Sequence, residues 1–388
     1  MIPVKTKQNN REVFNNMSTT GFGRPAASKQ KIRSSSLSKL NVFTSARREQ
    51  DGFVYLNVVD EPFVIGGIDH PKNNGGEFFR LDAARRDDYS GANRGLAENT
   101  PGACVRFATN AAQISLRITL RAGCFGMHHF CDRGVYGVDA YVGTGTARFY
   151  VGGQMQTFAD NHDVNVGTLN LPKGIKEVMV ELPLYAGIAK LEVGFPRSAR
   201  IGKPTERTVK PVAFYGSSIT QGGCVSRPGS AYTNIICRAL DADCRNFGFS
   251  GSAMGELPVA DYIGRCELSC FVMDYDYNAP TVEHLKATHE PFFKRIRELQ
   301  PDLPVVFVTH PFYSDPNQTD LDRIAVVKNT YDNAVAAGDK NVAFVDSRVF
   351  FTKDMRDLYA VDNLHPNDLG QMDMAQKIFP FVKKLINK

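Results

Sequence analysis

The chain has 388 residues, of which 43% are hydrophobic and 22% are charged, a composition typical of a globular protein with room for two cores. No apolar run approaches the ~20 residues of a membrane span, and no apolar segment of a secretory signal is visible, so we expect a cytoplasmic protein without membrane contact. Of the formal net charge of +5, the first 49 residues carry +8, which leaves −3 for the rest and no electrostatic case for nucleic acid.

The N-terminal segment, residues 1–48, is rich in Asn, Ser, Lys and Arg, and its apolar residues follow no fixed period. A segment of this composition cannot bury enough apolar surface to offset the entropy of folding. We therefore expect a disordered basic extension. An anionic partner could contact this arm, but a solvated arm accounts for the same residues.

A series of short strand-like runs predicts a β domain over residues 49–205. In the clearest run, Gln113–Leu120, apolar and polar residues alternate with period two, as in a half-buried strand. No stretch of this part has a helical period, and many short strands at close spacing favour an all-β sandwich or jelly roll. The expected strands are 53–56, 63–65, 78–81, 103–107, 113–120, 135–142, 147–151, 178–182 and 190–195.

Strands and helices alternate in the last part of the chain, residues 206–388. Five short apolar runs are separated by segments whose apolar residues repeat with helical spacing. This alternation predicts an α/β domain with a doubly wound, parallel, five-stranded sheet. The expected strands are 211–215, 244–247, 268–275, 305–309 and 342–345, and the expected helices are 231–240, 257–263, 281–300, 321–337 and 367–386.

The first strand of this α/β domain runs into a turn that could carry a nucleophile. The segment Pro211–Gly223 reads PVAFYGSSITQGG, so the strand ends at Gly216 and small hydroxyl residues follow before a helix. The carboxyl end of a parallel strand opens onto the crevice where α/β sheets bind ligands. A helix N-terminus beyond it offers free N–H groups to a developing anion. A plain helix N-cap would use the same residues.

Two further polar stretches follow strands of the same domain. Asn246–Gly251 is a Gly-rich turn whose backbone N–H groups could point into the crevice, or a tight loop that needs positive φ. Asp274–Asn278 places three polar side chains at the end of an apolar strand, which is too many for a buried core. The amide of Asn278 could face developing negative charge, or the segment could be an Asx-turn that opens the next helix.

A third stretch, Asp362–Pro366, reads DNLHP and lies directly before the last helix. An Asp and a His three residues apart can meet on one turn. The carboxylate of Asp362 can then accept the Nδ1–H of His365, which fixes the tautomer and leaves Nε2 free as a base. The alternative is a structural histidine whose ring nitrogens are hydrogen-bonded at the surface or in the core.

Together these four stretches resemble the blocks of the SGNH (GDSL-type) hydrolase superfamily, and they occur in that family's order. The resemblance implies a flavodoxin-like catalytic domain in which Ser218, within Gly216-Ser217-Ser218-Ile219, is the nucleophile and Asp362 and His365 complete the triad. It implies an oxyanion hole formed by the N–H of Ser218, the N–H of Gly251 and the side chain of Asn278. It implies no cofactor and no metal.

Two positions depart from the family pattern, and a second resemblance lies upstream. The family's Gly-Asp-Ser is Gly-Ser-Ser at residues 216–218, and its Gly-x-Asn-Asp is Asp-Tyr-Asn-Ala at residues 276–279. The catalytic atoms survive both changes, which alter the wall of the pocket and therefore the substrate. Residues 137–141 (GVDAY) and 182–185 (LPLY) are similar to the β domain that precedes the catalytic domain in one bacterial branch of the family.

Four further residues are candidates for substrate binding. His128 and His129 lie in a Gly-rich loop of the β domain, and they would line the site if the two domains pack face to face. Arg227 follows the nucleophile block and could hold an anionic or hydroxylated substrate. Asp276 is the fourth candidate. For the two histidines and Arg227, a loop residue satisfied by solvent is the alternative, and we expect His310 to be structural.

We expect a serine esterase that hydrolyses short-chain O-acyl esters, acetyl in particular, of a small molecule or an oligosaccharide. The carbohydrate part rests on fold analogy, which does not fix function. The alternatives are a lipase or thioesterase of the same fold, which would need an apolar acyl groove, a non-catalytic carbohydrate-binding protein, and a nucleic-acid adaptor that uses the basic arm. The sequence leaves the oligomeric state open.

The eight cysteines show no spacing that is typical of a metal site. Several of them lie in apolar runs, where a cysteine behaves as a small hydrophobic residue. Free thiols are therefore expected, with a Cys124–Cys131 pair as the alternative for an exported protein.

Overall fold

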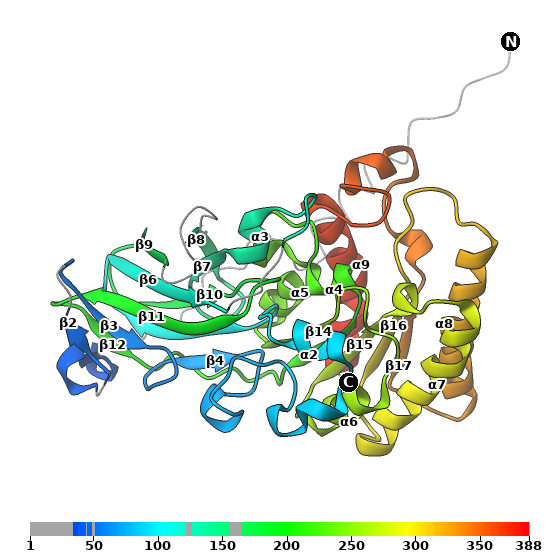
Figure 1. Cartoon of the computed structure of the whole chain (residues 1–388), viewed down its shortest axis with the longest axis horizontal. Helices are drawn as coiled ribbons and strands as arrows, with labels where there is room; N and C mark the ends of the chain where they lie inside the picture. Colours follow the sequence, from blue (N-terminus) through cyan, green and yellow to red (C-terminus); the bar gives the residue numbers. More distant parts are fainter. Residues whose placement is uncertain (1–33, 44, 49–50, 122–125, 155–164, 388) are drawn as a thin grey trace, which may run out of the picture.

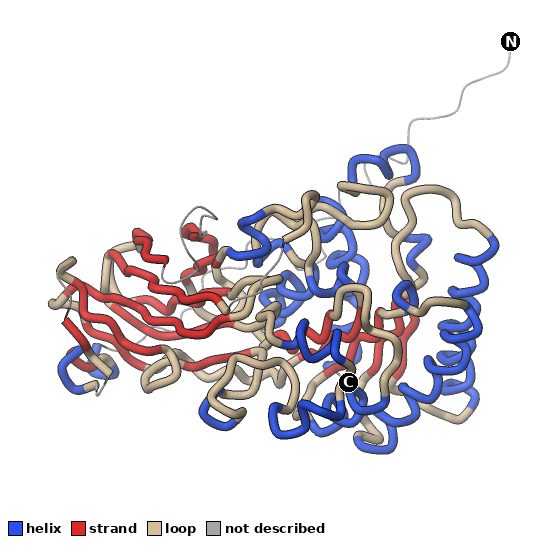
Figure 2. The backbone as a smooth tube through the Cα atoms, viewed as in Figure 1, coloured by secondary structure: helices blue, strands red, loops and turns tan. Residues whose placement is uncertain are grey.

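A computed structural model describes residues 34–43, 45–48, 51–121, 126–154 and 165–387 of the chain. Figure 1 shows an antiparallel β-sandwich at one end of the molecule and an α/β domain at the other. Strands fill the first part and helices surround the sheet of the second (Figure 2). The expected fold class is therefore confirmed.

The sandwich consists of two antiparallel sheets whose inner faces share one core. Phe107 in one sheet packs edge-on against Phe195 in the other, with ring centroids 5.5 Å apart, and both rings are fully buried. The first sheet has the order β1-β12-β5-β10-β7-β8 with β4 beside β5, and the second has the order β2-β3-β11-β6-β9. The strands of the first sheet are β1 (Ser38–Lys39), β4 (Val64–Gly66), β5 (Cys104–Thr109), β7 (Val138–Val142), β8 (Phe149–Gln154), β10 (Lys176–Glu181) and β12 (Arg200–Gly202). Those of the second are β2 (Arg47–Arg48), β3 (Phe53–Asn57), β6 (Gln113–Leu120), β9 (Asn165–Asn170) and β11 (Ile188–Pro196).

The end of the expected N-terminal extension is ordered rather than disordered. Strand β1 pairs with β12, and β2 pairs with β3, so this segment adds an edge to each sheet. Burial of two leucine side chains stabilises this segment on the sandwich, since Leu37 and Leu40 are only 2% and 4% exposed. Residues 1–33, the larger part of the expected extension, lie outside the described residues.

The β domain differs from the expectation in several further places: strands β9 and β12 were not expected, and residues 135–136, expected at the start of a strand, are helical. Residues 78–81 form no strand, because Phe79 and Leu81 pack against the α/β domain instead of joining a sheet. Two short helices, α2 (Gly91–Ala97) and α3 (Asp132–Tyr136), lie where no helical period is visible. Helices of five to seven residues make too few turns to show a period.

The α/β domain contains a parallel five-stranded sheet of order β14-β13-β15-β16-β17. Apolar residues on both faces of each strand require cover on both sides. Helices α5 and α9 cover one face, and α6, α7 and α8 cover the other (Figure 1). The strands are β13 (Val212–Gly216), β14 (Cys244–Gly248), β15 (Cys270–Asp274), β16 (Val305–Val308) and β17 (Val342–Val345). The helices are α4 (Ser218–Gln221), α5 (Tyr232–Leu240), α6 (Leu257–Arg265), α7 (Val282–Leu299), α8 (Gln318–Ala336) and α9 (Asp368–Ile386).

A buried arginine joins the two domains. Arg80 is 1% exposed, and its guanidinium donates hydrogen bonds to the carbonyl oxygens of Asn246 and Gly248, both at 2.8 Å. It also donates to Asn99 at 3.0 Å and lies over the ring of Phe249. The end of β14 is therefore held by a side chain of the β domain.

Among the described residues, no helix has the length and apolar character needed to cross a bilayer.

Candidate active site

The turn after β13 fixes the position of Ser218. Ser217 caps α4, because its Oγ accepts a hydrogen bond from the N–H of Ile219 at 3.1 Å. The strand must end in glycine here, since a Cβ on Gly216 would lie 2.2 Å from the carbonyl oxygen of Asp274. Gly222 closes the short helix in the left-handed conformation, with φ at 103°. The sequence thus presents Ser218 at the carboxyl end of a central strand.

The structure brings Ser218, His365 and Asp362 together. The Oγ of Ser218 lies 2.9 Å from Nε2 of His365, and Nδ1 of the same ring lies 2.9 Å from Oδ2 of Asp362. The backbone N–H groups of Leu364 and His365 donate to Oδ1 of Asp362 at 2.9 and 2.6 Å. Burial raises the pKa of Asp362, but the hydrogen bonds from the His365 ring and from this backbone outweigh burial and lower the pKa below its ordinary value. An ionised Asp362 therefore orients the imidazole.

The three expected oxyanion donors lie on neighbouring loops at this edge of the sheet. The N–H of Ser218 is at the first position of α4, where no helical partner exists. Phe249 connects the other two loops, because its N–H donates to Gly216 at 2.8 Å and its carbonyl oxygen accepts from Nδ2 of Asn278 at 2.9 Å. An amide nitrogen carries two hydrogens, so one remains for a ligand. Gly251 has φ at 65°, and a Cβ there would meet nothing within 4 Å.

Of the two candidate histidines, His129 lies next to His365 and Asp362. Its Nε2 lies 3.7 Å from Oδ2 of Asp362, and its ring centroid is 5.2 Å from that of His365. Burial lowers the pKa of His129, and His365 lowers it further, while Asp362 opposes the change. His128 is exposed beside it. The β domain thus contributes a side chain next to His365.

Arg227 does not point into the site. Its guanidinium donates hydrogen bonds to Oδ2 of Asp139 and to the hydroxyl of Tyr141, both at 2.6 Å, and it stacks on the ring of Tyr150. Asp139 is fully buried in β7. The expected role in substrate binding therefore gives way to an ion pair between the two domains, and the GVDAY segment supplies its acceptors.

Asp276 is likewise buried, at 1% exposure. Its carboxylate accepts from the ring Nδ1 of His310 at 2.8 Å and from the His310 backbone at 3.1 Å. Arg323 donates to the carbonyl oxygens of Asp276 and Ala279. The expectation that this segment is too polar for the core was wrong, because each buried carboxylate has partners there: the hydroxyls of Tyr232 and Thr220 donate to Asp274, and His310 donates to Asp276. Asp276 thus holds the loop that carries Asn278.

The sequence did not single out two residues that support the nucleophile. The hydroxyl of Tyr185, in the β domain, donates to the carbonyl oxygen of Ser218 at 3.1 Å. Gln221 donates to the carbonyl oxygen of Leu184 at 3.1 Å and accepts from the N–H of Ser250 at 3.0 Å. Tyr185 is the last residue of the LPLY segment, so the resemblance of the β domain pointed to this stretch without assigning the tyrosine a role.

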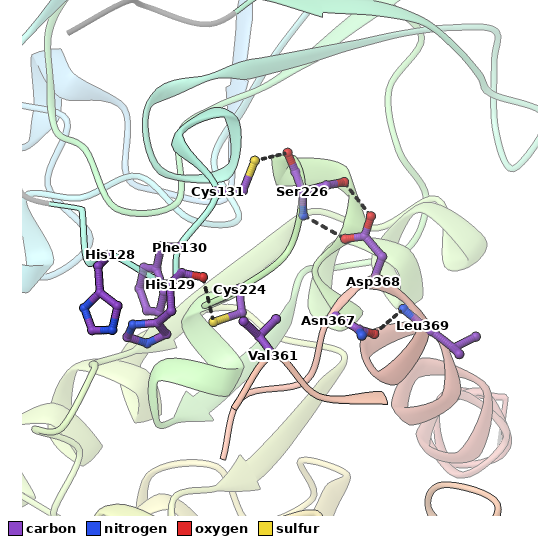
Figure 3. Close-up of a pocket in the computed structure, with 10 residues that line it drawn as sticks. All are labelled: His128, His129, Phe130, Cys131, Cys224, Ser226, Val361, Asn367, Asp368 and Leu369. Atoms are coloured by element: carbon purple, nitrogen blue, oxygen red, sulfur yellow. Dashed lines mark hydrogen bonds between the residues drawn. The ribbon is translucent and has the colours of Figure 1, made fainter. Parts of the chain in front are cut away.

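A cavity of about 510 Å³ lies beside the His365 turn. Figure 3 shows that its lining comes from both domains, and that Asp368 accepts two hydrogen bonds from Ser226 across it. Imidazole, hydroxyl, amide and carboxylate groups alternate with apolar side chains along the wall. The lining residues are His128, His129, Phe130, Cys131, Cys224, Ser226, Val361, Asn367, Asp368 and Leu369.

The thiol of Cys131 is free and exposed, and it donates to the carbonyl oxygen of Ser226 at 3.4 Å. Its alternative partner, Cys124, lies outside the described residues.

Two family models match the chain in succession. Residues 209–383 match the GDSL-like lipase/acylhydrolase family, and residues 53–201 match the N-terminal domain of SGNH-type esterases. The resemblance seen in the sequence is therefore confirmed for both parts. No curated protein sequence matches this chain.

Solved structures share the two-domain fold at low sequence identity. A protein described as a GDSL-like lipase from Bacteroides ovatus is 23% identical with a TM-score of 0.77, covering 86% of this chain and 98% of its own. A salicylyl-acyltransferase from a tetracycline biosynthetic pathway is 17% identical with a TM-score of 0.69, covering 87% and 98%. A family two carbohydrate esterase from Clostridium thermocellum, in complex with cellohexaose, is 16% identical with a TM-score of 0.52, covering 74% and 94%.

Proposed function

We propose that this chain, a member of the GDSL-like acylhydrolases, is a serine esterase that removes short O-acyl groups, acetyl first, from a carbohydrate. The observation that carries the proposal is the 2.9 Å contact between Oγ of Ser218 and Nε2 of His365, with Asp362 behind the imidazole. A hydroxyl, a base and an orienting carboxylate in this order are what acyl transfer through a covalent intermediate requires.

Acylation begins when Nε2 of His365 takes the proton of Ser218 as Oγ bonds to the acyl carbon. The carbonyl electron pair moves onto oxygen, and the N–H groups of Ser218 and Gly251 together with the amide of Asn278 stabilise this oxyanion. Each such donor typically lowers the barrier by about 2.7–4 kcal/mol. The tetrahedral intermediate collapses, the bond to the alcohol oxygen breaks, and His365 returns the proton to the leaving alcohol.

Deacylation repeats these steps with water. His365 takes a proton from water, whose oxygen bonds to the acyl carbon of the Ser218 ester. Collapse of the second tetrahedral intermediate breaks the bond to Oγ, and the proton passes from His365 to Ser218. Asp362 stays ionised throughout and stabilises each imidazolium.

The wall of the cavity beside His365 supports a polar alcohol. His128 offers an exposed imidazole of the kind that can bind a sugar hydroxyl, while Ser226 and Asp368 are hydrogen-bonded to each other and make this part of the wall polar; a lipase would need a continuous apolar groove. The fold that is shared with a carbohydrate esterase crystallised with cellohexaose also favours an oligosaccharide substrate.

Chain-length profiling tests the acyl group. We expect p-nitrophenyl acetate to give the highest kcat/KM, with a fall of at least about tenfold at the octanoate, since each further methylene would lie outside the acyl site. The reverse order would identify a lipase. Activity should be absent from Ser218→Ala, which controls for contaminating esterases.

Acetylated xylo- and cello-oligosaccharides test the alcohol. Release of acetate with kcat/KM above that of p-nitrophenyl acetate supports the carbohydrate reading. Binding of the oligosaccharide without acetate release would indicate a non-catalytic binding protein. Acetyl transfer to an added alcohol in preference to water would indicate a transferase, the activity in the name of the salicylyl-acyltransferase that shares this fold.

A further inference from the structure

Three possible metal ligands converge beside the proposed catalytic base. One ligand atom each of His129, Cys224 and His365 lie within 4.8 Å of one another. Zinc binds nitrogen at about 2.0–2.1 Å and sulfur at about 2.3 Å in tetrahedral geometry, so its ligands lie roughly 3.3–3.8 Å apart. Movements of about 1 Å would therefore bring these three atoms into place around one ion.

The three residues come from separate segments of the chain, so the fold, and not their spacing in the sequence, brings them together. His129 lies in the loop before α3, Cys224 in the loop after α4, and His365 in the turn before α9. Figure 3 shows His129 and Cys224 on adjacent segments of the cavity wall, where the thiol of Cys224 donates to the carbonyl oxygen of His129 at 3.6 Å. Both domains thus contribute to the cluster.

Two independent features mark the cluster as more than core packing. Nε2 of His129 is buried and has no hydrogen-bond partner among the described residues. Buried polar atoms are nearly always paired, so an unpaired one needs an explanation such as a bound ion. Cys224 has φ at 67°, a left-handed conformation that is rare for a residue with a side chain and that tends to occur at functional sites.

The charges of the cluster suit a divalent ion. On binding, the thiol of Cys224 would release its proton to solvent and form a metal–sulfur bond. The resulting thiolate and the carboxylate of Asp362, 3.7 Å from Nε2 of His129, together balance a charge of +2. Imidazole and thiolate donors select zinc and similar ions over magnesium or calcium.

We propose that His129, Cys224 and His365 form a binding site for a divalent transition-metal ion, zinc in particular, and that the bound ion switches the esterase off. Inhibition follows from the ring of His365. Its Nε2 contacts Ser218 and its Nδ1 contacts Asp362, so whichever nitrogen binds the metal gives up one hydrogen bond of the triad. The inhibition rests on the proposed function, whereas the site itself does not.

Metal binding is tested first on the full-length Ser218→Ala protein, which keeps all three ligands and needs no activity. Zn²⁺ titrated in a calorimeter should bind at one ion per chain. Co²⁺ should produce a thiolate-to-cobalt charge-transfer band and the visible bands of a tetrahedral site. Adding Cys224→Ala should abolish the charge-transfer band, and adding either Cys224→Ala or His129→Ala should weaken zinc binding by at least about tenfold.

Two matched controls lie on the same wall. His128→Ala and Cys131→Ala remove an exposed imidazole and an exposed thiol next to the proposed ligands, and both should leave zinc affinity and the cobalt spectrum unchanged. No binding of either ion would overturn the proposal, and so would binding that survives both ligand variants unchanged.

Inhibition is then measured on the wild-type protein with p-nitrophenyl acetate. Zn²⁺ should inhibit at the concentration at which it binds, and EDTA should restore the rate. His129→Ala, compared with its own metal-free rate, should need at least about tenfold more Zn²⁺. Binding without inhibition of an active enzyme would refute the switch. If the protein bound metal but hydrolysed no ester at all, the proposed function would fail and the metal site would stand.

Discussion

The guanidinium of Arg227 lies 2.6 Å from the carboxylate of Asp139, and the pair joins the loop after the nucleophile to strand β7 of the sandwich. Asp139 is 0% exposed and also accepts from the N–H of Gly229 at 2.9 Å. A carboxylate that is removed from water in this way is costly unless a cation accompanies it. The two domains are thus joined by an ion pair on the loop that follows the Ser218 turn.

Arg227→Ala should reduce the free energy of unfolding by about 3 kcal/mol, because Asp139 then stays buried and, among the described residues, keeps only the more distant Arg133, at 4.0 Å, as an ion-pair partner. Urea unfolding followed by circular dichroism measures this loss. Adding Asp139→Asn should recover part of it, since a neutral amide costs less to bury. A KM that rises about tenfold with unchanged stability would instead return Arg227 to substrate binding.

Asn278→Ala should lower kcat for p-nitrophenyl acetate by about 10²–10³ with little change in KM, because the proposed donor acts on the oxyanion rather than on the bound ester. Steady-state kinetics with matched thermal midpoints measure the effect. A loss below about threefold would remove Asn278 from the oxyanion hole and leave its bond to Phe249 as its whole role.

Asp362→Asn should lower kcat by about 10³–10⁴, because the amide NH2 can donate to Nδ1 and so favour the tautomer in which Nε2 carries the proton and cannot act as a base toward Ser218, and because the amide carries no charge to stabilise the imidazolium. The isosteric change tests orientation and charge with little change in packing. A kcat for Asp362→Asn equal to that of the wild type between pH 6 and 8 would mean that His365 needs no carboxylate partner.

His289 predicts how stability depends on pH. It is fully enclosed on α7, its Nδ1 contacts the hydroxyl of Thr330 at 2.8 Å, and burial lowers its pKa from 6.5 to about 4. The unfolded chain therefore binds a proton between pH 6.5 and 4 that the folded protein does not, so this contribution is complete above pH 6.5 and is lost as the pH falls toward 4. From pH 7.5 to pH 5 the free energy of unfolding should drop by about 2 kcal/mol from this residue.

Urea unfolding at both pH values checks this slope. His289→Gln should lose that part of the pH dependence, whereas the exposed His128→Gln should keep it. Equal slopes in the wild type and in His289→Gln would show that His289 is not the group responsible.

The strand and helix periods were sufficient to predict the sandwich, the parallel sheet and the strand end that carries Ser218. The pairing of Ser218 with His365, which lies in the turn before α9 and not at a strand end, was predicted from the family resemblance. The partners of single charged residues could not be predicted. Arg227 reads as a free cation until β7 is placed beside it, and Asp276 reads as a surface carboxylate until His310 and Arg323 surround it.

The same limit explains residues 78–81 and the end of the N-terminal extension. Phe79, Arg80 and Leu81 have the apolar–polar alternation of a strand, but Phe79 and Leu81 join the core of the α/β domain, and Arg80 donates to the carbonyl oxygens of Asn246 and Gly248, more than 160 residues away in the chain. Leu37 and Leu40 lie in a polar context whose composition predicts disorder. A few buried contacts with distant strands outweighed local composition in both cases.

Covalent labelling tests the central claim most directly. The full-length protein is incubated with a fluorophosphonate, which reacts with activated serines, and the adduct is located by peptide mass spectrometry with hydrolysis followed in parallel. We expect one adduct per chain, on Ser218, in proportion to lost activity, and none in Ser218→Ala or His365→Ala. An adduct on another residue, or esterase activity retained in Ser218→Ala, would contradict this expectation.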